Sequence, residues 1–339
     1  MRRCLQLAHL GSAKVAPNPM VGCVLVHPRA GIIGEGWHQA FGGAHAEVNA
    51  INVVADEKLL REATAFVNLE PCSHFGKTPP CADLIIEKGI PEVIICNTDP
   101  NPLVSGRGIK KLQEAGIKVE WGLLENEGRE LNRFFFTAQE KRRPFITLKW
   151  AQTKDGFIAR EDGSSKWISS PQSRLQVHKM RAEHQAIMAG RNTLRTDNPS
   201  LNVRDWNGRQ PVRIICDPNL DLSPELKVFK DENSPTWVFN NLKESESGLL
   251  RFIQVQHPDS IEMVLEFLWK AGIHSVFVEG GTQLLNQFIE KDLWDEALVF
   301  TGPIDFQNGL KAPETKNFKL RKEGFCGPDL VQVFTPVSG

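Results

Sequence analysis

Apolar positions in the first 121 residues follow two periods, one typical of strands and one typical of helices. Short apolar runs bounded by Gly, Pro and polar residues favour buried strands. Longer stretches with an apolar residue every three or four positions favour helices. In chain order the pattern predicts a helix over 1–10, strands over 21–26 and 31–36, a helix over 44–55, a strand over 65–69, a helix over 81–88, a strand over 92–96, a helix over 106–115 and a strand over 117–121. Strands alternating with helices indicate an α/β layered domain.

A polar stretch over 138–144, ending in Pro144, is the best candidate for a domain boundary. A second α/β series follows it. The pattern predicts helices over 171–181, 261–271 and 283–290, and strands over 145–150, 186–189, 212–216, 236–239, 275–278 and 296–300. We therefore expect two domains, 1–143 and 144–339.

Composition narrows the class of protein. A chain of 339 residues has room for two ordinary domains, and its net charge of -1 does not favour a nucleic-acid partner. No apolar run approaches the ~20 residues that cross a bilayer. Seven scattered cysteines and an N-terminus without a signal-peptide core indicate a cytoplasmic protein without a disulfide framework. The absence of Tyr excludes any tyrosine proton donor.

Three ligand-type residues stand at the ends of predicted elements. His45 opens a helix, Cys72 follows a strand, and Cys81 begins another helix after eight intervening residues. One His and two Cys suit a tetrahedral Zn²⁺ site with an open fourth position. Glu47, two residues after His45, is placed to reach a water in that position and to shuttle its proton. The alternative is that a chance His-x-Glu and two core cysteines stand here without a metal.

Three segments carry a family resemblance: 17–22 (PNPMVG), 45–50 (HAEVNA) and 70–81 (EPCSHFGKTPPC). They resemble the bifunctional riboflavin-biosynthesis deaminase/reductases, and the long loop between Cys72 and Cys81 is specific to that group. The resemblance implies a cytidine-deaminase-like three-layer domain. It also implies that His45, Cys72 and Cys81 are the zinc ligands and that Glu47 is the proton donor.

The same loop offers groups for the substrate. Lys77 suits a phosphate, with a solvated loop lysine as the alternative. Asn18, in a turn held by two prolines, could read a pyrimidine edge, and its alternative is an ordinary turn residue. The expected ligand of this half is a small pyrimidine nucleotide.

In the second half a predicted buried strand runs into Gly280-Gly281 and then into a helix. Glycines there let backbone N–H groups approach a phosphate at a helix N-terminus, although such a pair is also common in a plain tight turn. No Gly-x-Gly-x-x-Gly opens a strand–helix unit, so an ordinary Rossmann domain is not indicated.

Segments 148–156, 165–169 and 193–204 are similar to the reductase half of the same family, which has a dihydrofolate-reductase-like fold. By that resemblance the NADPH site comprises Ala151, Trp167, Thr193, Asp197, Gly281, Thr282, Gln283, Leu284, Leu285, Asn286 and Gln287. The substrate residues are Ser165, Arg181, Leu201, Arg204 and Glu279, and Lys149 is a candidate for orienting the sugar. Plainer alternatives are a surface ion pair for Arg181, a loop cation for Arg204 and core filling for Trp167. Arg191 and Arg195 are candidates for the extra phosphate of NADPH.

The leading hypothesis is zinc-dependent deamination of a diaminopyrimidinone ribosyl phosphate, followed by NADPH-dependent reduction of its ribosyl group to ribityl. One alternative is a monofunctional deaminase with a non-catalytic C-terminal domain. Another is a nucleic-acid-binding module with a structural zinc, which the near-neutral charge and the place of Glu47 disfavour. The resemblance further implies a homo-oligomer, either a dimer or a tetramer.

Overall fold

The computed structural model describes residues 1–73, 79–101, 105–165 and 168–337. It divides into two compact units, Met1–Arg142 and Arg143–Gly339. The division lies one residue before the expected boundary. The polar stretch at the boundary is helical up to Lys141, because Ala138 and the two phenylalanines before it bury one face of that helix. No helix within the described residues is long and apolar enough to cross a membrane.

The first unit is built on a five-stranded sheet in the order β2-β1-β3-β4-β5. β1 pairs antiparallel with β2 and with β3, whereas β3, β4 and β5 run parallel. The strands are β1 (Gly22–His27), β2 (Gly31–Trp37), β3 (Thr64–Leu69), β4 (Glu92–Asn97) and β5 (Lys118–Trp121). Ile95, Val93 and Val67 are fully or almost fully buried in its core, as expected for strands covered on both faces.

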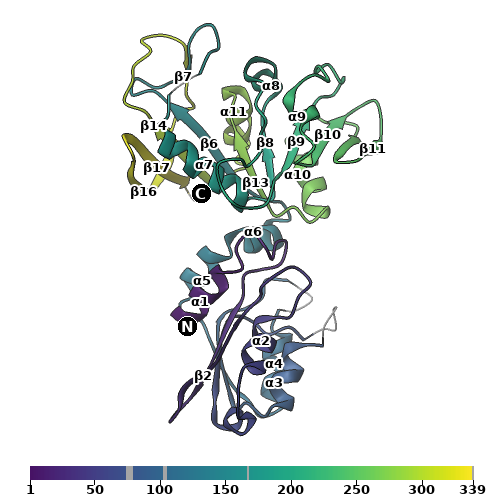
Figure 1. Cartoon of the computed structure of the whole chain (residues 1–339), viewed down its shortest axis with the longest axis vertical. Helices are drawn as coiled ribbons and strands as arrows, with labels where there is room; N and C mark the ends of the chain where they lie inside the picture. Colours follow the sequence, from purple (N-terminus) through teal and green to yellow (C-terminus); the bar gives the residue numbers. More distant parts are fainter. Residues whose placement is uncertain (74–78, 102–104, 166–167, 338–339) are drawn as a thin grey trace. The chain divides into compact units, whose positions relative to one another are not determined.

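Helices cover both faces of this sheet and make three layers (Figure 1). α2, α3 and α4 lie on one face, where their apolar residues share a core with β1, β3 and β4. α1 and α5 lie on the other face. The helical elements are α1 (Arg2–His9), α2 (Ala46–Asn52), a 3₁₀ helix over Glu57–Glu62, α3 (Cys81–Glu87), α4 (Arg107–Glu114), α5 (Glu125–Leu131) and α6 (Arg133–Lys141). The three-layer α/β domain predicted for this half is confirmed.

The second unit is built on a ten-stranded sheet in the order β11-β12-β10-β9-β8-β13-β6-β14-β17-β16. The seven strands from β12 to β14 in this order run parallel, and β11, β17 and β16 are antiparallel additions at the two edges. The strands are β6 (Phe145–Gln152), β8 (Ala186–Met188), β9 (Val212–Cys216), β10 (Thr236–Asn240), β11 (Ser245–Ser247), β12 (Leu250–Gln254), β13 (Ser275–Glu279), β14 (Glu296–Thr301), β16 (Phe318–Cys326) and β17 (Asp329–Pro336). A separate two-stranded sheet joins β7 (Phe157–Ala159) to β15 (Leu310–Lys311).

Alternate residues of the central strands enter two different cores. In β13, Val276 and Val278 face one core and Phe277 faces the other, because successive side chains of a strand point to opposite faces. The first core contains the apolar faces of α10 and α11, and the second contains those of α7 and α8. The helices are α7 (Pro171–Glu183), α8 (Arg191–Asp197), α9 (Lys227–Lys230), α10 (Ile261–Lys270) and α11 (Thr282–Glu290).

Candidate active sites

Three metal-ligating side chains from separate elements of the first unit meet at one point. The Nδ1 atom of His45 lies 3.6 Å from the Sγ atom of Cys72 and 3.3 Å from the Sγ atom of Cys81. The three ligand atoms all lie within 4.8 Å of one another. The sequence predicted these three residues as a set, and the structure brings them together.

Local structure explains how each ligand reaches this point. His45 is the extended N-cap residue of α2, and Cys81 is the first residue of α3. Cys72 lies in the loop after β3, where its Sγ atom accepts the backbone N–H of Cys81 at 3.3 Å. Two ligands thus stand at helix N-termini, whose partial positive charge favours thiolate over thiol.

The spacing of the three atoms fits a zinc ion. Tetrahedral bonds to one nitrogen and one sulfur separate those two atoms by about 3.6 Å, close to the two separations found here. The charges fit as well. The hydrogen bond from the Cys81 thiol lowers the pKa of Cys72, and the same hydrogen bond, with burial, raises the pKa of Cys81. The two sulfurs thus share one proton, and a cation between them would allow both to be thiolates.

Glu47 is buried in the first turn of α2, close to the three ligand residues. It is the second residue of α2 and is 4% exposed. Burial, and then the nearby Cys72 thiolate, raise the pKa of its carboxyl to about 7, and the carboxyl interacts with the Cys81 thiol. A carboxyl that titrates near neutrality beside a metal position is suited to taking up and releasing a proton.

Asn18 lies on the histidine side of the cluster. Its amide nitrogen is 3.4 Å from Nε2 of His38, and the His38 ring packs edge-on against the His45 ring with centroids 5.6 Å apart. Burial lowers the pKa of His38, so its neutral ring donates from Nδ1 to the carbonyl of Ala44 (3.1 Å) and accepts the Asn18 amide at Nε2. Lys77, the expected phosphate ligand, lies outside the described residues.

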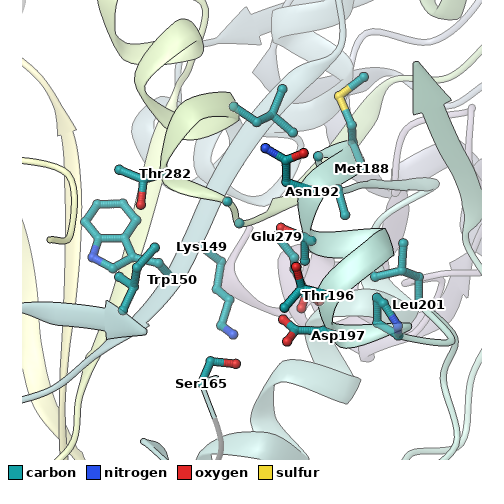
Figure 2. Close-up of a pocket in the computed structure, with 18 of the residues that line it drawn as sticks. Lys149, Trp150, Ser165, Met188, Asn192, Thr196, Asp197, Leu201, Glu279 and Thr282 are labelled. Carbon is teal, nitrogen blue, oxygen red and sulfur yellow. The ribbon is translucent and has the colours of Figure 1, made fainter. Parts of the chain in front are cut away.

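The second unit contains a cavity of about 1080 Å³ at the carboxyl ends of β6 and β13. Its volume is at the upper end of the usual range for small-molecule sites. Figure 2 shows the Lys149 side chain pointing toward Ser165, with Asp197 and Glu279 facing the same space. The predicted residues that line this cavity are Lys149, Ala151, Ser165, Arg181, Thr193, Asp197, Leu201, Arg204, Glu279, Gly281, Thr282, Gln283, Leu284 and Gln287.

Two of the predicted cofactor residues, Leu285 and Asn286, do not join this lining. The side chain of Leu285 is fully buried in the core, and that of Asn286 is not among the lining residues. The reason is helical geometry: residues 284 and 287 face the cavity, whereas 285 and 288 face the sheet. Trp167 lies outside the described residues.

A buried ion pair joins two of the predicted substrate residues. Arg181 donates from Nε and Nη2 to the carboxylate of Glu279 at 2.5 and 2.8 Å, and both side chains are almost buried. Burial acts to raise the pKa of Glu279, but the charge and hydrogen bonds of Arg181 outweigh it and lower this pKa to about 2. The amine of Lys149, whose pKa burial lowers, adds to the same field. Glu279 is therefore an anion at the end of β13.

The glycine pair has the conformation that its predicted role requires. Gly280 and Gly281 have φ angles of +65° and +33°, which side chains rarely adopt, and Gly281 is the N-cap residue of α11. Thr282, Gln283 and Leu284, in the first turn of α11, line the cavity. Free backbone N–H groups of a helix N-terminus therefore border it.

Comparisons with known proteins match both units. The cytidine and deoxycytidylate deaminase zinc-binding region matches residues 1–97, and the RibD C-terminal domain matches residues 144–306. The riboflavin biosynthesis protein RibD of Aquifex aeolicus is 40% identical, with 98% of this chain and 97% of that protein covered. RibD of Bacillus amyloliquefaciens is 42% identical, with 96% and 88% covered.

The chain belongs to the RibD family of riboflavin biosynthesis proteins. A crystal structure from Thermotoga maritima, described as a diaminohydroxyphosphoribosylaminopyrimidine deaminase/5-amino-6-(5-phosphoribosylamino)uracil reductase, agrees with this. It is 39% identical, covers 99% of this chain and 97% of its own, and superposes with a TM-score of 0.90. The predicted fold class, a cytidine-deaminase-like domain followed by a dihydrofolate-reductase-like domain, is confirmed.

Membership in the RibD family decides between the hypotheses. Both a deaminase domain and a reductase domain are present, so the chain is a bifunctional enzyme of riboflavin biosynthesis. A monofunctional deaminase with a non-catalytic second half is not favoured. The deaminase domain is of the zinc-binding kind, and the reductase domain of this family uses NADPH, so both predicted cofactors are confirmed.

The sequence patterns do not predict some of the residues at these two sites. His38 follows β2 directly, and only its place at a strand end could have suggested that it contacts the His45 ring. Asn192 and Thr196 line the cavity from α8, a helix that was not predicted. Their spacing of four residues puts them on one helical face. His178 also lines the cavity, one turn before Arg181 on α7.

Proposed function

We propose that this chain deaminates 2,5-diamino-6-ribosylamino-4(3H)-pyrimidinone 5′-phosphate and then reduces the ribosyl group of the product to ribityl. The observation that supports the first step best is the convergence of one imidazole nitrogen and two sulfurs beside the buried Glu47 carboxyl. The name of the Thermotoga maritima structure supports the order of the two reactions.

In the deaminase site His45, Cys72 and Cys81 would hold the zinc ion. Zinc bound there supplies the positive charge that makes water a nucleophile at neutral pH. Glu47 takes the proton of the attacking water and delivers it to the departing amino group, which leaves as ammonia. Asn18, held by its hydrogen bond to His38, offers its amide oxygen to the pyrimidine edge. Lys77 is proposed for the substrate phosphate.

In the reductase site Arg204 and Glu279 would bind different parts of the substrate, its phosphate and its ribose. Arg204 is 58% exposed, and only Asp205, at 3.4 Å, forms an ion pair with it among the described residues, so Arg204 suits a phosphate. Glu279, fixed by Arg181, accepts hydrogen bonds from ribose hydroxyls. The amine of Lys149, which points toward Ser165, orients the ring-opened sugar. Leu201 packs against the base.

When bound, NADPH would supply a hydride to the first carbon of the ring-opened ribosyl imine, whose nitrogen would take up a proton from water, leaving the CH₂–NH group of the ribityl chain. The glycine turn and the first turn of α11 would bind its pyrophosphate through backbone N–H groups of residues 281–284, which precede the first intrahelical hydrogen bond, from Leu285 to the Gly281 carbonyl. Ala151, Thr193 and Asp197 border the nicotinamide and its ribose, and Trp167 is proposed as a wall of the same site. Leu285 and Asn286 would contribute by holding α11 in place, because the Leu285 N–H already donates to the Gly281 carbonyl and the Leu285 side chain is in the core.

We also infer a cytoplasmic enzyme that acts as a dimer or tetramer. All seven cysteines are free, which suits a reducing compartment. Fractionation of the source cells tests the location, and light scattering of the purified chain tests the oligomeric state. A monomer at micromolar concentration would contradict the second inference.

The proposed pair of reactions is tested by supplying each substrate separately. The purified chain should release ammonia from the diaminopyrimidinone nucleotide without NADPH. It should oxidise NADPH when given the deaminated product. Failure of the second reaction while the first proceeds would show that the substrate proposed for the reductase is wrong.

A further inference from the structure

Glu70 is a buried carboxylate two residues before the metal-ligating Cys72. It is 4% exposed, and four backbone N–H groups surround it. Its Oε1 atom accepts from Gly108 and Ile109 at 3.0 and 3.3 Å, and its Oε2 atom accepts from Asp99 and Gly106 at 3.2 and 3.1 Å. Both oxygens of one side chain are thus occupied by the backbone of another segment.

Two of these donors belong to the first turn of α4. The N–H groups there have no partner within the helix, and their partial positive charge favours an anion. Glu70 supplies that anion from the end of β3. The carboxylate therefore ties the start of α4 to the segment that leads into Pro71 and Cys72.

Contacts on both sides fix the backbone of this segment. On the α4 side, a Cβ atom at Gly108 would lie only 2.1 Å from the carbonyl oxygen of Pro71, so only glycine permits this approach. On the α3 side, the N–H of Ala82 donates to the carbonyl of Cys72 at 3.1 Å. Cys81 also donates its backbone N–H to the Cys72 sulfur. Cys72 is thus held between two helix N-termini.

We propose that Glu70 is a positioning residue for the zinc site, because its four hydrogen bonds set where the Cys72 sulfur stands. The inference rests on the proposed zinc role of His45, Cys72 and Cys81. Groups that orient a metal ligand without touching the metal commonly change metal affinity 10- to 100-fold when removed. Glu70 would orient Cys72 by fixing the backbone around it, rather than by a hydrogen bond to the Cys72 side chain.

Glu70→Gln tests this role while keeping the shape of the side chain. Its amide NH₂ would face two N–H donors that now face an oxygen, so at least two of the four hydrogen bonds are lost. We expect zinc affinity, measured by competition with a chromophoric chelator, to fall about tenfold or more. In cobalt-substituted protein the thiolate-to-cobalt absorption band should weaken or shift. Glu120→Gln is the matched control, since Glu120 is exposed on β5 and pairs only with Lys118 among the described residues.

Gly108→Ala disturbs the backbone at Pro71, next to Cys72, and leaves the Glu70 side chain unchanged. It should also weaken zinc binding, because the new methyl group displaces the Pro71 carbonyl. Urea unfolding followed by circular dichroism reports whether the first unit of each variant remains folded, and NADPH oxidation with the deaminated intermediate reports on the second unit. Zinc affinity within twofold of wild type in both variants, or an unchanged cobalt band, would overturn the proposal. A wild-type chain that binds no zinc would instead overturn the zinc site itself.

Discussion

Arg181 and Glu279 form the most extensively bonded ion pair of the reductase cavity. Two hydrogen bonds join the guanidinium to the carboxylate, at 2.5 and 2.8 Å, and a third reaches the backbone carbonyl of Asn202 at 2.9 Å. One cation therefore connects α7, the end of β13 and the loop that carries Leu201 and Arg204. The geometry of the proposed substrate site depends on this pair.

Glu279→Gln should destabilise the second unit by about 3 kcal/mol, because it leaves the buried Arg181 without its counter-charge. Denaturation by urea, followed by circular dichroism, measures the loss. Glu266→Gln is the control, since Glu266 is exposed and pairs with Lys270 one turn along α10. Its effect should stay below about 0.5 kcal/mol. Equal effects of the two variants would show that the buried pair contributes no more than a surface pair.

The same pair should make stability depend on pH in the acidic range. The pKa of Glu279 is lowered to about 2 in the folded protein from 4.5, so the unfolded chain binds the proton first as pH falls. The stabilisation is complete above pH 4.5 and is lost as pH falls toward 2. The difference in unfolding free energy between wild type and Glu279→Gln should shrink by about 2 kcal/mol from pH 5 to pH 3. A constant difference over this range would contradict the pKa assigned to Glu279.

Cys81→Ser should remove zinc and abolish deamination while leaving NADPH oxidation on the deaminated product unchanged. A serine hydroxyl remains protonated at neutral pH and does not replace the thiolate ligand. Elemental analysis of the purified variant measures the metal. Cys96→Ser is the matched control, because the Cys96 thiol is buried in the same domain and donates to the Leu124 carbonyl, as a hydroxyl can. Retention of one zinc per chain in Cys81→Ser would mean that the ligand set is different.

Arg195→Ala should reduce the preference for NADPH over NADH by about tenfold, the worth of one charge-assisted hydrogen bond to the extra phosphate. Arg191→Ala should reduce it less, because Asp217 and Asp259 lie within 4.0 Å of the Arg191 guanidinium and already engage its charge. The ratio of kcat/KM for the two cofactors is the measurement. Unchanged ratios in both variants would place the phosphate elsewhere.

The zinc cluster could be predicted from the sequence because its chemistry is local. His45 and Cys81 each stand at a helix start, and Cys72 follows a strand, so the residue types and their positions indicated one site. The contact between the His38 and His45 rings could not be predicted in this way. It depends on how β2 and α2 pack, and no spacing along the chain specifies that.

The second domain shows where sequence patterns stop being informative. β16 is exposed along nearly its whole length, so its residues have no alternating buried pattern, and this strand was missed. The resemblance predicts one cofactor-binding stretch over 281–287, yet the helical turn places Leu285 in the core. α8 was missed as well, and of its residues only Leu194 is buried, which is too little to show a helical period.

The central claim is that one chain performs two successive reactions at two separate sites, and Glu47→Gln tests it most directly. Wild-type protein given the diaminopyrimidinone nucleotide and NADPH should release one ammonia for each NADPH oxidised. The variant should keep its zinc, release no ammonia and oxidise no NADPH with that substrate. It should oxidise NADPH at the wild-type rate when given the deaminated intermediate. Continued ammonia release by the variant, or loss of its reductase activity, would contradict the account.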